Sequence, residues 1–228
     1  MRNLFLAVML SVLAQPVNAI EPLSLYGQEA VYTVERKGKP IGTYQIRFAP
    51  WQQEGLQVDV EMQLGFRYLA LFEYEFNYRA REYWQGNKRL ERMQVQIDDD
   101  GKQTEYRFSR KEDGLYRDNA EQGDEYLGDQ LLTSNHWHPE VVQQDALINT
   151  LTGSVSNLDV TLEADESVTV GSHRVEASRY RLGGELGDTL SWYDQRGRWL
   201  GMEFSARDGS RVRIWMEPEL YAHAGEDL

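Results

Sequence analysis

Apolar residues alternate with polar ones over most of the chain. Between residues 56 and 66 every second residue is apolar, and most residues between them are polar or charged. The apolar positions are Leu56, Val58, Val60, Met62, Leu64 and Phe66. Because successive side chains of a β-strand point to opposite faces, this period of two predicts a long strand with one buried face.

The same alternation recurs in later segments, which turn residues separate. The next segment, residues 72–78, has aromatic residues on its apolar face and Glu73 and Glu75 on the other, where we expect a solvated surface. The remaining segments are residues 93–97, 104–108, 200–204 and 212–216, and turn signals lie at Gly38, Gly86, Gly101, Gly114, Gly197 and Gly209. Strands joined by such tight turns are typical of an antiparallel meander.

One segment departs from this alternation. Residues 139–151 carry apolar residues near helical spacing, with Pro139 suited to a first helical position and Gly153 to a terminus. The acidic residues 118–129 predict an exposed loop but no domain boundary, because strand patterning resumes later. We therefore expect an all-β fold: a single antiparallel curled sheet of about ten strands, a barrel or half-barrel, with one short helix near 139–151 that plugs or flanks it.

Residues 1–19 have the features of an export signal. Arg2 provides a positive start, residues 4–13 are apolar, and Val17 and Ala19 are small residues at the cleavage positions. The apolar stretch is too short to span a bilayer. We predict cleavage after Ala19, a single β domain over residues 20–228, and, because the signal is bacterial in style, a periplasmic location.

The composition narrows the classes of function. The chain has 228 residues, 24 Lys plus Arg against 37 Asp plus Glu, a formal net charge of −13 and no cysteine. This charge argues against a nucleic-acid partner, which needs surplus cations to neutralise phosphates. Without cysteine the chain cannot form disulfides, zinc ribbons, iron–sulfur clusters, a thiol nucleophile or a lipid anchor. No later stretch reaches the roughly 20 apolar residues of a transmembrane segment.

Two histidines lie close together in the sequence Asn-His-Trp-His-Pro. In an extended segment, His136 and His138 would point the same way and, with a carboxylate, could bind zinc or iron. Alternatively, the segment is a tight entry to the helix, where His138 or Ser134 caps backbone N–H groups and Trp137 packs on the sheet. The proline and glutamate that follow favour the cap. We therefore expect no metal and no other cofactor, with the two histidines as the weak metal candidates.

Several short motifs, taken in order, resemble an uncharacterised family of exported bacterial proteins, a domain of unknown function. The resemblance spans Ala30 to Met216 and rests on residues 82–86 (EYWQG), 100–102 (DGK), 136–139 (HWHP), 192–194 (WYD) and 208–210 (DGS). It implies an exported single-domain β protein, distantly similar in style to the curled-sheet periplasmic carriers of lipoproteins and lipids, and brings no assigned activity. The family pattern has Asn where this chain has His138, which disfavours a metal ligand there.

Aromatic residues suggest the leading function. The apolar loop over residues 66–72 would form the lip of a cavity at one end of the sheet, or simply cover the core. The candidate ligand-binding residues are Phe66, Tyr68, Phe72, Trp137 and Trp192. We expect a non-enzymatic carrier or binding protein for an apolar or amphipathic ligand, a hydrophobic small molecule or lipid. The alternatives are a periplasmic enzyme, such as a metal-dependent hydrolase using His136 and His138, and a structural or assembly partner of envelope proteins. No catalytic motif is present.

Overall fold

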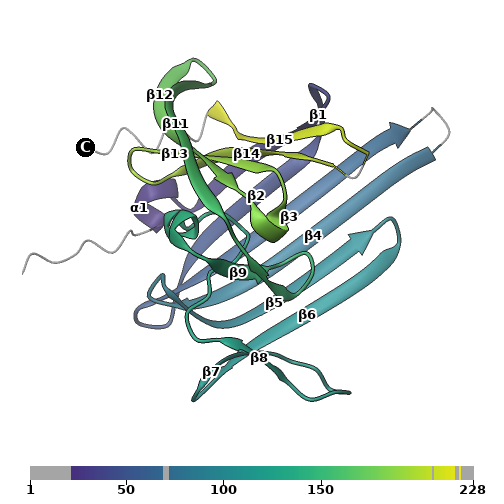
Figure 1. Cartoon of the computed structure of the whole chain (residues 1–228), viewed down its shortest axis with the longest axis vertical. Helices are drawn as coiled ribbons and strands as arrows, with labels where there is room; N and C mark the ends of the chain where they lie inside the picture. The colour runs from purple at the N-terminus through teal and green to yellow at the C-terminus, as the bar shows by residue number, and fades with distance from the viewer. Residues whose placement is uncertain (1–21, 69–71, 207, 219–220, 222–228) are drawn as a thin grey trace, which may run out of the picture.

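A single curled antiparallel sheet dominates the computed structural model, which describes residues 22–68, 72–206, 208–218 and 221 (Figure 1). The predicted signal over residues 1–19 lies outside these. The thirteen strands, in spatial order, are β11 (Val160–Val170), β12 (His173–Leu182), β13 (Thr189–Asp194), β14 (Trp199–Ser205), β15 (Arg211–Met216), β1 (Glu29–Arg36), β2 (Lys39–Trp51), β3 (Gly55–Tyr68), β4 (Phe72–Gln85), β5 (Arg89–Asp99), β6 (Lys102–Lys111), β7 (Gly114–Arg117) and β8 (Glu125–Gly128). The predicted curled sheet is confirmed, with more strands than ten.

The two ends of the described chain meet in the middle of the sheet. β1 pairs with β15, with Tyr32 opposite Met216 and Val34 opposite Ile214. This pairing joins the run β1–β8 to the run β11–β15. The chain then has to travel from β8 at one edge to β11 at the other. Residues 129–158, here called the plug, make this connection across the concave face of the sheet (Figure 1).

The prediction of a helix over residues 139–151, within the plug, is largely wrong. Only its start is helical, as the 3₁₀ helix η1 (Pro139–Gln143), and the chain then forms the hairpin of β9 (Ala146–Asn149) and β10 (Ser154–Asn157). The backbone N–H of Ile148 donates to the carbonyl of Leu132 and its carbonyl accepts from Ser134, both bonds that a helix would forbid. The acidic stretch 118–129 is also shorter as a loop than predicted, since its last residues form β8.

Two further short helices were not predicted from the sequence, α1 (Pro22–Tyr26) and η2 (Gly184–Leu186). Neither these nor η1, the helices of the described ranges, is long and apolar enough to cross a bilayer.

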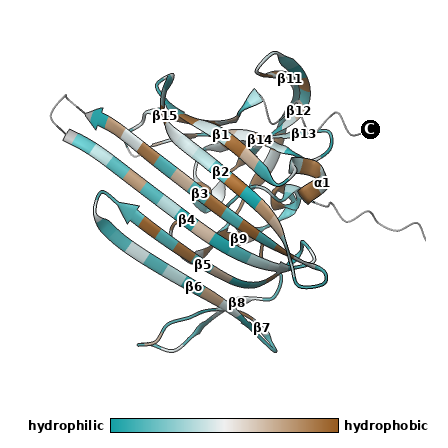
Figure 2. Ribbon diagram, turned by 180° about the vertical axis from the view of Figure 1, so that it is seen from behind, coloured by the Kyte–Doolittle hydropathy of each residue, from teal (hydrophilic) through white to brown (hydrophobic). Residues whose placement is uncertain are grey.

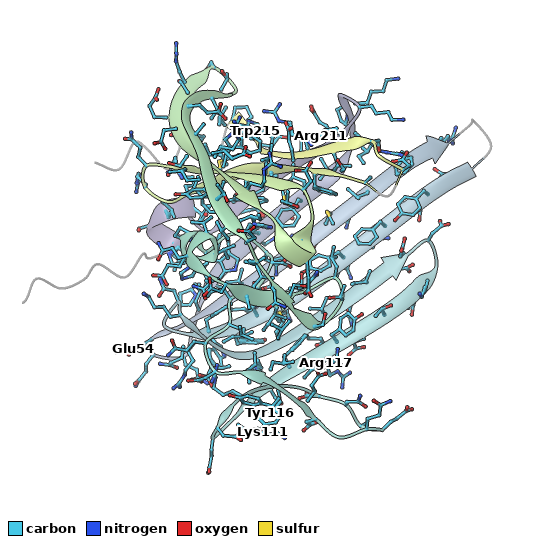
Figure 3. The ribbon with its side chains drawn as sticks, in the orientation of Figure 1. Glu54, Lys111, Tyr116, Arg117, Arg211 and Trp215 are labelled. Carbon is cyan, nitrogen blue, oxygen red and sulfur yellow. The ribbon has the colours of Figure 1, made fainter. Side chains whose placement is uncertain are left out.

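The alternation of the sequence divides the sheet into an inner and an outer face (Figure 2). On β3, Val58 and Val60 are fully buried on the inner face, and on β4 the predicted solvated residues Glu73 and Glu75 are exposed on the outer one. Figure 3 shows side chains crowded over the half of the sheet that the plug covers, while Glu54 and Lys111 point outward at the periphery. The inner residues of β3 beyond the plug are only half-buried, from Met62 to Phe66. The plug therefore fills one half of the concave face and leaves the other open.

Candidate functional site

Buried tyrosines hold the plug in place. His136 has a positive φ of 59°, and this left-handed turn directs three consecutive carbonyls toward different strands and α1. Each carbonyl accepts a hydrogen bond from a tyrosine hydroxyl: Asn135 from Tyr44 (3.1 Å), His136 from Tyr193 (3.0 Å) and Trp137 from Tyr26 (2.9 Å). Burial raises the pKa of all three tyrosines, which keeps them protonated as donors. The turn is thus anchored at each of these three buried carbonyls.

A buried carboxylate organises the same turn. Glu82 of β4 is fully buried, and each of its oxygens accepts two hydrogen bonds. Oε1 accepts from Thr133 (2.8 Å) and Asn135 (2.6 Å), and Oε2 accepts from the indoles of Trp84 (2.9 Å) and Trp137 (3.0 Å). Burial raises the pKa of Glu82, and these four hydrogen bonds oppose the rise. Sequence reasoning assigned Glu82 no role, although its even position places it on the inner face of β4.

The histidines follow the capping arrangement. Nδ1 of His138 accepts from the backbone N–H of Glu140 (3.1 Å) and so caps η1, while Oγ of Ser134 accepts from the backbone N–H of Thr150 (3.0 Å). His136 stacks on Trp199, with ring centroids 5.6 Å apart. Burial lowers the pKa of both histidines to about 4. Both imidazoles are therefore neutral at neutral pH.

The two imidazoles have different surroundings. His136 faces Trp199 of β14, whereas His138 lies near Asn87, Lys88 and Glu140 beyond the end of β4. The left-handed turn at His136 breaks the extended geometry on which the shared-ligand hypothesis rested. Among the described residues, no group of three or more His, Asp or Glu side chains is placed to hold a metal ion.

An apolar groove occupies the open half of the concave face. Its outer chamber has a volume of about 430 Å³ and its inner chamber, against the plug, about 240 Å³. Met62, Leu151 and Phe204 line both chambers, which makes the groove continuous. The outer chamber is further lined by Ile41, Leu64, Phe66, Tyr74, Phe76 and Val212. Leu151, at the β9–β10 turn, keeps about half of its surface exposed (51%).

The predicted ligand-binding residues occupy three different environments. Phe66 lines the outer chamber. Trp137 is 1% exposed inside the plug, and Trp192 packs on the outer face of the sheet, where its ring meets Trp215 at 5.5 Å. Tyr68 and Phe72 are register partners at the ends of β3 and β4, but their side chains and residues 69–71 lie outside the described set. Of the three described side chains, only Phe66 lines the groove.

Charged groups stand at the rim of the outer chamber. Arg36 lies 4.2 Å over the Phe66 ring, pairs with Asp208 and donates from Nε to Ser210 (2.8 Å). Hydrogen bonds from the Ser210 hydroxyl and backbone, together with Arg36, hold the pKa of Asp208 at about 2. Asp99 accepts a hydrogen bond from the hydroxyl of Tyr74 (2.7 Å).

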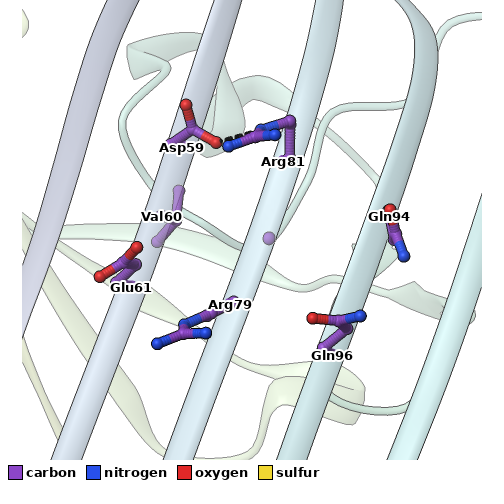
Figure 4. Close-up of a pocket in the computed structure, with 8 residues that line it drawn as sticks. Asp59, Val60, Glu61, Arg79, Arg81, Gln94 and Gln96 are labelled. Carbon is purple, nitrogen blue, oxygen red and sulfur yellow. Dashed lines mark hydrogen bonds and ion pairs between the residues drawn. The ribbon is translucent and has the colours of Figure 1, made fainter.

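The outer face of the sheet has a contrasting, polar hollow (Figure 4). Asp59 and Arg81 form an ion pair of 2.5 Å across β3 and β4, and Gln94 and Gln96 of β5 complete the surface. The cations and anions here offset one another, so the hollow is a solvated face of the kind that the alternation predicts.

Comparisons with known proteins agree with the fold. A family model described as a domain of unknown function, DUF6134, matches residues 32–217, which confirms the resemblance to an uncharacterised family. No curated protein matches significantly. A crystal structure of a beta-barrel-like protein of the domain of unknown function DUF1849 from Brucella abortus is similar, with a TM-score of 0.57, 10% identity, and coverage of 82% of this chain and 94% of that one. At this identity the likeness concerns the fold alone.

Proposed function

We propose that this chain, which belongs to the DUF6134 family, is a non-enzymatic periplasmic carrier or binding protein for an apolar or amphipathic ligand. The single observation that supports the proposal most is the continuous apolar groove beside the plug. The outer chamber has a volume typical of small-molecule sites, and both chambers have an apolar lining and open to solvent.

The hydrogen bonds of the plug support a groove that stays open in the absence of ligand. A sheet with an apolar face normally buries that face against another element. Here the plug buries one half, and its position is set by the Glu82 hydrogen bonds and the tyrosine hydroxyls. The plug cannot slide over the other half without breaking this buried network, so the groove is kept open for a ligand.

Binding of a hydrophobic probe tests the proposal. In the Met62→Arg variant a charged side chain would enter the junction of both chambers, and we expect an environment-sensitive apolar dye or a fatty alcohol to bind at least about tenfold more weakly. Gln63→Arg, one residue further and exposed on the outer face, is the matched control and should bind like the unmodified protein. Equal binding by all three proteins, or none by the delipidated unmodified protein, would refute the proposal.

The export signal proposed for residues 1–19 is tested separately. Cell fractionation should place the protein in the periplasm, and N-terminal sequencing of the mature chain should begin at Ile20. An uncleaved chain in the cytoplasm would contradict this part.

A further inference from the structure

The rim of the groove carries a carboxylate, Asp99, that has no counter-ion among the described residues. Asp99, at the end of β5, lines the outer chamber and is half-buried. Its hydrogen-bond partner is the neutral hydroxyl of Tyr74 at 2.7 Å. Among the described residues Asp99 forms no ion pair within 4.0 Å, and Lys102, opposite it in the β5–β6 register, is exposed and absent from the groove lining.

The other charges at the rim are already matched. Arg36 donates to Asp208 and Ser210 and stacks on Phe66, and 14% of its side chain remains exposed. The hydrogen bonds that keep Asp208 ionised also fix this pair in place. Among the described residues that line the outer chamber, Arg36 and Asp208 cancel, which leaves the carboxylate of Asp99 as their net charge.

Aromatic rings surround this carboxylate. Phe76 is the register partner of Asp99, Tyr74 is bonded to it, and Phe66 packs on Tyr74 with ring centroids 5.1 Å apart. Aromatic faces together with a carboxylate are the groups that bind ammonium ions, above all quaternary ones. The protein already uses one of these rings in this way, since the Arg36 guanidinium lies over Phe66.

We propose that the ligand is an amphiphile with a cationic ammonium head, which lies at Asp99 and the aromatic rim while its apolar chain follows the groove past Met62 and Leu151. This inference rests on the proposed function and specifies the ligand class for the same groove. The formal net charge of −13 acts in the same direction, because it attracts cations and repels anions.

Three detergents with the same alkyl chain test the inference by titration calorimetry below their micelle concentrations. We expect the purified protein to bind dodecyltrimethylammonium at least about tenfold more tightly than dodecanoate, with neutral dodecyl maltoside between them. In Asp99→Asn the preference for the cation over the anion should fall several-fold toward parity. Glu75→Gln removes the same charge from the exposed outer face of β4 and should leave the preference unchanged.

The outcomes separate the two proposals. Binding of all three detergents with no preference, or with dodecanoate the tightest, would overturn the cationic head and leave the carrier intact. An equal loss of preference in Glu75→Gln would assign the effect to overall charge and also overturn it. Binding of none would refute the carrier itself. If Asp99→Asn fails to fold, the ranking of the three detergents on the unmodified protein decides alone.

Discussion

Glu82 is a carboxylate in the core that has no cationic partner among the residues the structure describes. Four hydrogen bonds from neutral groups replace its hydration, and three of these donors, on Thr133, Asn135 and Trp137, belong to the plug. Glu82 uses both oxygens to accept hydrogen bonds from two donors each. If an N–H group replaced one of these oxygens, it would point at two other donors and neither hydrogen bond could form. We therefore expect the free energy of unfolding to fall when a single carboxylate oxygen of Glu82 is replaced.

The Glu82→Gln variant tests this sensitivity. Its amide nitrogen would face two donors in the core, and we expect the free energy of unfolding to fall by about 3 kcal/mol, measured by urea denaturation. Glu73→Gln, the same change on the exposed face of β4, should stay within about 0.5 kcal/mol of the unmodified protein. A Glu82→Gln protein as stable as the control would show that the network does not hold the fold.

The buried histidines make stability depend on pH. The folded-state pKa of His136 and His138 lies at about 4, below the ordinary value of 6.5, so the unfolded chain takes up these protons first. Their contribution is complete above pH 6.5 and is lost as the pH falls toward 4, by up to about 1.4 kcal/mol per pH unit for each histidine.

His138→Asn isolates one of the two contributions. Asparagine can still accept the hydrogen bond that caps η1, so the variant should keep its stability at neutral pH while losing part of the pH slope in denaturation curves. His173→Asn, at an exposed histidine, should retain the full slope. Identical slopes in both variants would contradict the assignment to buried imidazoles.

At the scale of single elements, local pattern predicted strands well and the plug poorly. The alternation from Leu56 to Phe66 predicts β3 from local sequence alone, because a strand with one solvent-exposed face and one buried face has this pattern. Residues 146–149 have apolar spacing that suits a helix, yet they pair with Leu132, Ser134 and β10. Those partners come from tertiary structure, and backbone pairing with them overrides the local preference.

The candidate site likewise contains residues that local sequence could indicate and residues that it could not. Phe66 belongs to an apolar stretch at a strand end that could form a cavity lip or cover the core, and in the structure it lines the outer chamber. Trp192 was selected for its ring alone, and the period of two could not reveal which face of the sheet is concave. The sequence gives Asp99 no role, because its place at the rim depends on its contact with Tyr74, 25 residues away.

Across the whole molecule, the same strands have a covered half and an uncovered half on their concave face. The inner residues of β3 from Leu56 to Val60 are buried, while those from Met62 to Phe66 are half-buried and line the groove. The filled end therefore has more buried apolar contacts than the open end, where the proposed ligand would lie. Local opening of a strand becomes easier where fewer apolar contacts cover it.

Amide hydrogen exchange along β3 and β4 should reveal this gradient. Amides from Leu56 to Val60 should exchange only through global unfolding, whereas those from Met62 to Phe66 should exchange at least about tenfold faster. A bound apolar chain covers only the open end, so saturation with a detergent that binds should slow exchange there and leave the filled end nearly unchanged. The matched comparison is the same measurement on Met62→Arg, in which the detergent should give no local slowing. Uniform protection along β3, or slowing spread evenly over the sheet on binding, would show that the two halves act as one unit and that the groove is not the place where the chain of the ligand lies.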